Sequence, residues 1–239
     1  MVEYAVPRSA LVIVAHPDDA EFTMAGTMAT WSAAGCTVTI CLCTDGNVGS
    51  HEPGMTRERL AGIRRREERA GCDRLGVSRV LFLGHDDGQL VGDLSLRREL
   101  VAVIRQIKPE AVIVQNPTRL FISDGYINHP DHRAAGQAAL DAVAPACESP
   151  LLWPELGAPH RVRWVYVWGH EHPNVFVDTT AAIESKVSAL REHVSQLRDR
   201  DPGPMLRDWG EASAAMAGEG FEGRYAEAFF RVTLNQEGQ

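Results

Sequence analysis

Four short apolar runs alternate with longer segments in which apolar residues recur at helical spacing. The runs are rich in β-branched residues and cover residues 10–15, 37–44, 79–83 and 111–115. The helical segments between them cover residues 22–34, 56–75 and 94–107. A continuous apolar run is typical of a parallel strand that is buried on both faces. The alternation therefore predicts an α/β fold, with a Rossmann-like, doubly wound and mostly parallel sheet and helices on both of its faces.

The carboxyl-terminal part of the chain has a less regular pattern. After Glu148 we expect edge strands at 163–167 and 175–178, a helix over 181–196, a loop over 199–204 and a closing segment over 225–234. A chain of 239 residues, 44% of them hydrophobic, can bury a full core, and an α/β unit of this size is commonly one domain. We therefore expect a single domain over residues 1–239, without an internal repeat.

Two short motifs stand where this pattern places the ends of strands and the starts of helices. His-Pro-Asp-Asp at residues 16–19 follows the first apolar run, and His-Pro-Asp-His at residues 129–132 begins a helical pattern. Proline suits such joints because it lacks an amide hydrogen and its φ is preset for the first helical turn. The carboxyl ends of parallel strands form the ligand crevice of a doubly wound sheet, so we expect both motifs at that edge.

The two motifs offer a set of metal ligands with groups left over for chemistry. Two imidazoles and one carboxylate are a ligand set that catalytic zinc sites use, with the fourth position left to water. Residues three apart converge only where the chain turns or enters a helix, which is what each proline favours. Imidazole and carboxylate also suit ferrous iron, so the sequence predicts Zn²⁺ with Fe²⁺ as the alternative.

Dinucleotide binding is the main competitor for such a fold, and the first turn argues against it. A nucleotide-binding turn needs glycines that let the backbone approach a pyrophosphate. This chain has two carboxylates there, and Gly26 comes only later. Taken alone, an aspartate after His-Pro is more often a helix cap than a catalyst. Two such motifs at one sheet edge favour a functional site.

Together the motifs resemble those of the LmbE-like (PIG-L) family of N-acetylglucosaminyl deacetylases, which includes deacetylases of the mycothiol and bacillithiol pathways. Similar segments recur between and after the motifs, at residues 64–67, 75–77, 83–88, 186–196 and 225–229. One departure lies in the loop after the second strand, where many members carry Gly-Glu and this chain has Asp45, Gly46 and Asn47. The substrate contacts of that loop therefore stay open.

The resemblance implies a zinc-dependent hydrolase that removes the N-acetyl group from an N-acetylglucosamine-containing small molecule. The residues that match family positions are His16, Asp19 and His132 as metal ligands, Asp18 as general base, His129 with Asp131 as its partner, and Arg65 and Asp87 as substrate contacts. Zinc lowers the pKa of a bound water to about 7, so Asp18 can take the water proton at neutral pH. A protonated His129 would stabilise the oxyanion or act as the acid.

Two other functions remain open at this point. A metal-dependent amidase or esterase acting on another substrate, such as a thiol conjugate, would use the same ligands. A non-catalytic, metal-stabilised sugar-binding module is the third reading. Asp18 argues against the binding module, because such a protein has no need of a spare carboxylate beside the metal.

Other polar residues have simpler interpretations. The charged run 57–69 predicts a solvent-facing helix stabilised by pairs such as Arg64 with Glu68, and Arg65 gains a role only through the resemblance. The remaining histidines are expected to be solvated or capping groups: His51, His85, His160, His170, His172 and His193. We expect specificity to depend on three loops, at 45–47, 116–128 and 149–159.

Charge and cysteine content restrict partners and compartment. The net charge of −8 argues against nucleic-acid binding, which needs basic surface. Five cysteines without a Cys-x-x-Cys motif do not suggest a disulfide framework, and Cys41 and Cys43 are expected in the core. No signal peptide or membrane anchor is recognisable before the first apolar run, so we expect a cytoplasmic protein without a membrane partner. A homo-oligomer is plausible by base rate alone.

Overall fold

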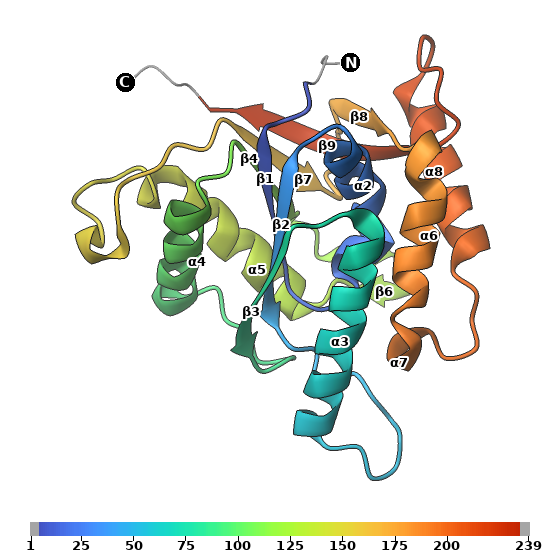
Figure 1. Cartoon of the computed structure of the whole chain (residues 1–239), viewed down its shortest axis with the longest axis horizontal. Coiled ribbons are helices and arrows are strands. Elements are labelled where there is room, and N and C mark those ends of the chain that lie inside the picture. Colours follow the sequence, from blue (N-terminus) through green and yellow to red (C-terminus); the bar gives the residue numbers. More distant parts are fainter. Residues whose placement is uncertain (1–4, 235–239) are drawn as a thin grey trace.

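Seven strands form one sheet in the computed structural model, which describes residues 5–234 (Figure 1). They are β1 Ser9–Val14, β2 Thr37–Thr44, β3 Arg79–His85, β4 Ala111–Gln115, β7 Trp164–Trp168, β8 Val175–Asp178 and β9 Ala226–Thr233. Their order is β3-β2-β1-β4-β7-β9-β8. The first five are mutually parallel, and β9 pairs antiparallel with both β7 and β8. The predicted α/β fold is confirmed; residues 1–4 and 235–239 of the expected domain lie outside the described residues.

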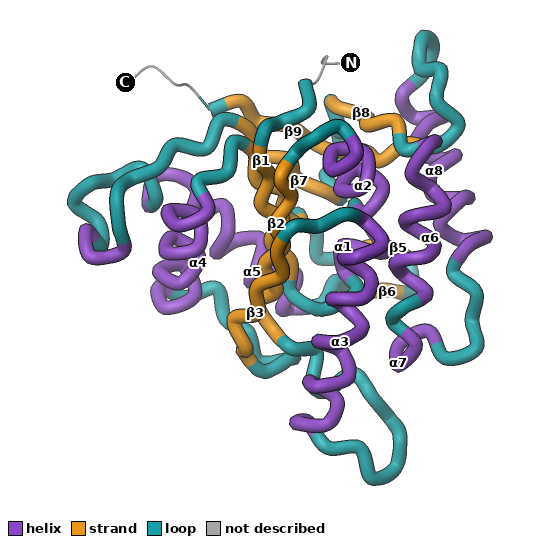
Figure 2. Tube along the Cα trace, viewed as in Figure 1, coloured by secondary structure: helices purple, strands orange, loops and turns teal. Residues whose placement is uncertain are grey.

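Helices cover both faces of this sheet (Figure 2). They are α1 Asp19–Thr23, α2 Ala25–Ala33, α3 Arg57–Leu75, α4 Leu94–Ile107, α5 Pro130–Asp141, α6 Ile183–Arg191, α7 Val194–Leu197 and α8 Gly203–Ala217. Helices α4 and α5 pack on one face, whereas α2, α3 and α6 pack on the other. Within the described residues, none of the helices combines the length and apolar character that crossing a membrane requires.

The central strand β1 shows why its sequence is continuously apolar. Leu11 and Ile13 belong to the core that includes α4 and α5, whereas Val12 and Val14 belong to the core that includes α2 and α3. All four side chains are fully buried. Successive strand residues point to opposite faces, so a strand covered by helices on both faces must be apolar at every position.

Capping residues set the ends of the best-predicted helices. The Thr56 side chain accepts a hydrogen bond from the Arg59 amide at 3.2 Å and starts α3, and Gly76 ends it with φ of 70°. Asp93 accepts from the amides of Ser95 and Leu96 and starts α4. These are ordinary N-cap and C′ residues, which is why local sequence predicts both helices closely.

Two expected helices are interrupted. The helix expected over 22–34 begins earlier, at Asp19, and breaks at Met24, whose φ of −132° is not helical. The helix expected over 181–196 is divided into α6 and α7 around His193. Both breaks carry side chains into the interior, which a helical periodicity does not reveal.

The carboxyl-terminal expectations need further correction. Strand β7 is internal rather than an edge strand, because β9 returns antiparallel between β7 and β8. The stretch 199–204 is only partly a loop, since α8 begins at Gly203. A small hairpin, β5 Phe121–Ser123 with β6 Tyr126–Ile127, lies inside the loop that we expected to set specificity.

The strand order reverses between β1 and β4. These neighbours lead to different sides of the sheet, since β1 is followed by α1 and α2, and β4 by the hairpin and then α5. Such a switch point opens a crevice beyond the carboxyl ends of the two strands. Both His-Pro motifs follow these strands, so the fold brings them to one crevice.

A buried ion pair links this sheet to α2 and α6. Glu227 of β9 accepts from the amides of Gly26 and Thr27 at the start of α2, at 2.9 and 2.7 Å, and from Lys186 Nζ of α6 at 2.6 Å. The carboxylate thus satisfies helix amides that have no side-chain cap of their own.

Loss of the lysine partner is expected to be costly. Lys186→Met should lower the free energy of unfolding by about 3–5 kcal/mol, because it leaves the buried Glu227 charge without its cation. Urea denaturation measures this. Arg74→Met is the control: it breaks an exposed pair with Glu192 and should cost about 1 kcal/mol or less. Equal losses in the two variants would contradict the expectation.

Candidate metal centre and active site

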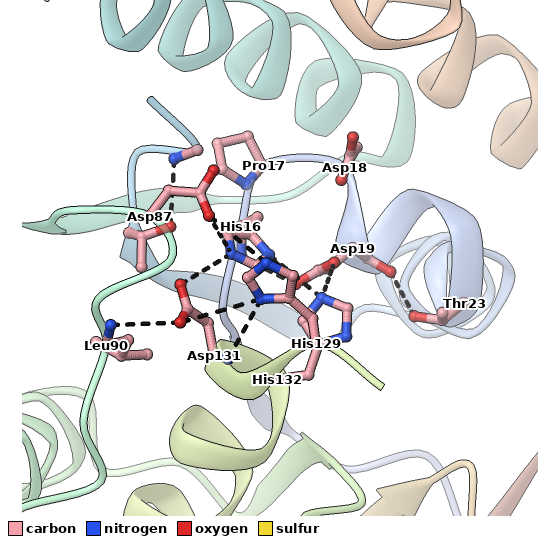
Figure 3. A network of polar contacts seen from close by, with 12 residues as sticks. His16, Pro17, Asp18, Asp19, Thr23, Asp87, Leu90, His129, Asp131 and His132 are labelled. Atoms are coloured by element: carbon pink, nitrogen blue, oxygen red, sulfur yellow. Dashed lines mark hydrogen bonds and ion pairs between the residues drawn. The ribbon is translucent and has the colours of Figure 1, made fainter. Parts of the chain in front are cut away.

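Both His-Pro motifs are joints into helices, as predicted. His16 follows β1, and Asp18 has a left-handed conformation with φ of 91° just before α1 begins. His129 is the N-cap of α5, and Pro130 and His132 both lie in its first turn. Figure 3 shows most side chains of the two motifs gathered at one place, with that of Asp18 standing to one side.

Donor atoms of three residues, His16, Asp19 and His132, form a compact triangle. His16 Nδ1 lies 3.2 Å from His132 Nε2 and 3.5 Å from Asp19 Oδ2, and His132 Nε2 lies 3.0 Å from Asp19 Oδ1. Four-coordinate zinc with bonds near 2.0–2.1 Å places neighbouring ligand atoms about 3.3–3.4 Å apart. The spacing of the donors and their chemistry therefore fit one small divalent ion. The His129 ring is also near, within a group in which donor atoms of His16, His129 and His132 lie within 4.8 Å of one another.

Two carboxylates fix the orientation of the His16 ring. His16 Nε2 lies 3.1 Å from Asp87 Oδ1 and 3.2 Å from Asp131 Oδ2, so Nδ1 faces the triangle. A carboxylate on the far nitrogen of a metal-binding histidine sets its tautomer and increases its basicity. Asp131 was expected to be the partner of His129, and its Oδ1 lies 4.0 Å from His129 Nδ1. Its contact with His16 is the closer of the two, at 3.2 Å.

Backbone amides stabilise Asp131 as an anion. Its carboxylate accepts from Gly88 N at 2.7 Å and from Leu90 N at 3.3 Å. Burial opposes ionisation of Asp131, but the contacts with His16 and Gly88 outweigh it and lower its pKa. On the other motif, His132 Nδ1 lies 3.2 Å from Asn128 Oδ1, a contact that orients the ring and that the sequence did not reveal.

Asp18 is a carboxylate that no described histidine contacts. Its Oδ2 accepts from Arg64 Nη2 at 3.0 Å, and only 13% of its side chain is exposed. Burial raises the pKa of Asp18 to about 6, against the opposing effect of Arg64. Arg64 also donates to the carbonyls of Pro17 and Gly46. Asp18 is therefore held firmly but left free of the metal ligands.

His129 presents one nitrogen to the cavity. Its Nδ1 accepts from the Asp131 amide at 3.3 Å, so a neutral ring carries its proton on Nε2. Burial and the neighbouring His16 lower the pKa of His129. The neutral ring is thus favoured, in contrast to the protonated His129 ring expected from the sequence. A neutral His129 can still donate one hydrogen bond through Nε2.

These groups line a cavity of about 490 Å³. The apolar side chains that line it come from several elements and include Phe22, Tyr126, Trp168 and Trp209. Asp87 reaches the cavity, as expected, but Arg65 does not line it. The Arg65 guanidinium is bound to Asp45 at 2.7 and 2.6 Å. Of the three loops expected to set specificity, 116–128 contributes to the walls, whereas 45–47 and 149–159 do not.

The charged helix α3 is more buried than expected. Arg64 and Glu68 were expected on a solvent-facing surface, yet they are 3% and 0% exposed. The signal was available: Leu60, Arg64, Glu68, Cys72 and Leu75 form one buried stripe at helical spacing, with apolar residues at both ends. Trp209 was missed because α8 was not predicted, although Pro204 and Gly218 bound it.

Cysteines behave as expected. Cys36, Cys41, Cys43, Cys72 and Cys147 are free and buried. Burial raises the pKa of the Cys41 thiol to about 12, which keeps it protonated. These thiols are therefore packing groups rather than nucleophiles.

The chain is similar to a known family and to characterised proteins. Residues 11–143 match the family model described as PIG-L, GlcNAc-PI de-N-acetylase. The chain is 33% identical over 192 residues to a diacetylchitobiose deacetylase of Thermococcus kodakarensis, a match that covers 79% of this chain and 70% of the relative. It is 31% identical over 221 residues to a 1D-myo-inositol 2-acetamido-2-deoxy-alpha-D-glucopyranoside deacetylase of Streptomyces avermitilis, covering 82% and 72%.

Solved structures show the same fold. The N,N'-diacetylchitobiose deacetylase from Pyrococcus horikoshii superposes with a TM-score of 0.85 at 29% identity, covering 95% of this chain and 84% of that one. A 4-carboxy-2-hydroxymuconate hydratase from Pseudomonas putida superposes with a TM-score of 0.76 at 23% identity, covering 97% and 99%. The fold by itself therefore does not define the reaction. The family match and the relatives above 30% identity do define the lineage: this chain belongs to the PIG-L family of de-N-acetylases.

Proposed function

We propose that this protein is a metal-dependent hydrolase that removes the acetyl group from an N-acetylglucosaminide, with Zn²⁺ held by His16, Asp19 and His132. The observation that carries the proposal is the triangle of donor atoms, 3.0 to 3.5 Å apart, beside a carboxylate that is not used as a ligand. Family membership supports the choice of an acetylated amino sugar over other amides.

The side chains divide the reaction between them. A zinc or ferrous ion held there supplies Lewis acidity, which lowers the pKa of water and polarises the amide carbonyl. Asp18 accepts a proton as the water oxygen attacks the acetyl carbon. His129 donates a hydrogen bond from Nε2 to the carbonyl oxygen as negative charge develops there. The carbon–nitrogen bond then breaks, Asp18 returns its proton to the leaving nitrogen, and acetate and a free amine are produced.

Release of amine by metal-depleted and metal-restored protein tests this proposal. Stripped protein should be inactive on N-acetylglucosaminides, and stoichiometric Zn²⁺ should restore turnover. A parallel arm with Fe²⁺ under anaerobic conditions compares the two metals. Restored metal binding with turnover only of other amides or esters would favour the amidase or esterase reading. Metal binding with no hydrolysis of any substrate would favour a sugar-binding module.

The charge of the cavity predicts which glycosides are preferred. Among the described residues that line it, Arg64 is the only lysine or arginine. Its side chain is 4% exposed and is occupied by Asp18 and two carbonyls. The aromatic walls suit the apolar faces of an uncharged sugar ring or aglycone. Among the described residues that line this cavity, no lysine or arginine is therefore left to pair with an anionic aglycone.

Uncharged substrates should therefore be turned over faster. We expect kcat/KM for N,N'-diacetylchitobiose to exceed that for the malate glycoside of N-acetylglucosamine by about tenfold or more, since an unpaired anion must be desolvated beside Asp18 and Asp87. Steady-state amine release measures both values, and the methyl glycoside serves as a small neutral control. A preference for the malate glycoside would contradict this assignment.

A further inference from the structure

Three ionisable side chains are completely buried behind the cavity. Glu21 comes from α1, Glu68 from α3, and His193 from the break between α6 and α7; each is 0% exposed. His193 Nε2 lies 3.6 Å from Glu21 Oε2 and 3.9 Å from Glu68 Oε2. We call these residues the buried Glu–His cluster. The mechanism proposed above uses none of them. From the sequence, Glu68 and His193 were expected at the surface, and Glu21 had no expected role.

Burial and the neighbouring charges change the pKa of two members of the cluster. Burial and the neighbouring Glu21 raise the pKa of Glu68 to about 8. Burial alone would lower the pKa of His193, but Glu21 and Glu68 outweigh it and raise it to about 9. The protonated forms of Glu68 and His193 are therefore favoured near neutral pH.

One contact connects the cluster to the active site. Glu68 Oε2 accepts a hydrogen bond from the backbone amide of Asp18 at 3.2 Å. Asp18 has φ of 91° and ψ of −22°, a left-handed conformation that non-glycine residues adopt only at a cost in free energy. Arg64, one turn earlier on the same face of α3, holds the Asp18 carboxylate and the Pro17 carbonyl. Two side chains of α3 thus contact Asp18 from one side, Glu68 at its backbone amide and Arg64 at its carboxylate.

We propose that Glu68, which is buried beside Glu21 and His193, is a positioning residue that fixes the left-handed backbone of Asp18 and so aims its carboxylate at the reacting water. The inference rests on the proposed function for its catalytic consequence, but its structural part stands independently. What Glu68 supplies is an acceptor oxygen at a fixed point, and a protonated carboxyl group or an amide supplies this equally well.

A pair of substitutions at Glu68 separates the acceptor from the charge. Glu68→Gln keeps an oxygen facing the Asp18 amide, and kcat should stay within about threefold of wild type. Glu68→Ala removes the acceptor and should lower kcat by about 10- to 100-fold, with KM within about threefold, because a small misplacement of a reacting group has a large kinetic effect. Bound metal should be equal in both variants.

Cys72→Ala provides the matched control. Cys72 lies one turn beyond Glu68 on the same buried face, and its Sγ contacts Glu68 Oε1 at 3.5 Å without touching Asp18. It should lose some stability but keep kcat near wild type. If Glu68→Ala does not fold, Glu68→Leu fills the space without restoring the acceptor and takes its place.

Crystal structures of the variants give a readout that needs no activity. The φ of Asp18 should stay positive in Glu68→Gln and leave the left-handed region in Glu68→Ala or Glu68→Leu. Unchanged kcat without the acceptor, an equal loss of kcat in Glu68→Gln, or a positive φ in every variant would overturn the inference. If the wild type itself released no amine, the proposed function would fail, while the φ of Asp18 would still decide this inference.

Discussion

Asp18→Asn is expected to lower kcat by about 10²- to 10⁴-fold while the protein keeps its metal, because the variant loses its proton acceptor but no ligand. Asparagine is the appropriate substitution here. It is nearly isosteric with aspartate and tolerates the left-handed conformation at φ of 91°. Alanine would add backbone strain to the loss of the carboxylate and so confuse the two effects.

Metal analysis and amine release measured on the same preparation check this expectation. Asp45→Asn is a suitable control, since Asp45 is a buried carboxylate at the same edge of the sheet that pairs with Arg65 and does not line the cavity. It should retain most of the wild-type kcat. An Asp18→Asn variant with kcat within about threefold of wild type would rule out Asp18 as the general base.

His132→Ala should weaken metal binding by at least about 100-fold and abolish turnover at low metal concentration, because it removes one corner of the donor triangle. His132 Nε2 faces both His16 and Asp19, and Asn128 holds the other nitrogen. Isothermal titration calorimetry with Zn²⁺ measures the dissociation constant of the metal in the wild type and in the variant.

His129→Ala offers the sharpest comparison, since this ring also lies within reach of the ion. Its Nδ1 is occupied by the Asp131 amide, and we assign Nε2 to the carbonyl oxygen rather than to the metal. The variant should therefore keep its metal and lose kcat. Metal loss in His129→Ala together with retention in His132→Ala would reverse the assignment of the ligand.

The parts of the fold that sequence predicts well are those determined locally. Strand β4 and helix α4 have the expected bounds, because each is a periodic segment with a clear boundary. The position of β9 between β7 and β8 depends on pairing between segments about 50 to 70 residues apart, which no local pattern encodes. The same limit explains why β7 was expected at an edge.

The site divides in the same way. The His-Pro motifs give the donor residues and the sheet edge at which they meet. Partnerships across the fold were not predictable: Asp131 lies closer to His16 than to His129, and Arg64 pairs with Asp18 whereas Arg65 pairs with Asp45. Adjacent arginines on a helix point about 100° apart, and the buried stripe of α3 places Arg64 inside without indicating which residue it meets there. The buried partner that decides the choice lies more than forty residues away in the chain.

The division of labour along the chain has a consequence for how such an enzyme can change. All the proposed metal ligands and Asp18 lie within residues 11–143, the segment that matches the family model. Trp168, Gln196 and Trp209, which close the cavity, come from later elements. Substitutions in the later elements can therefore change the substrate that is accepted while the residues proposed to carry out the reaction are unchanged.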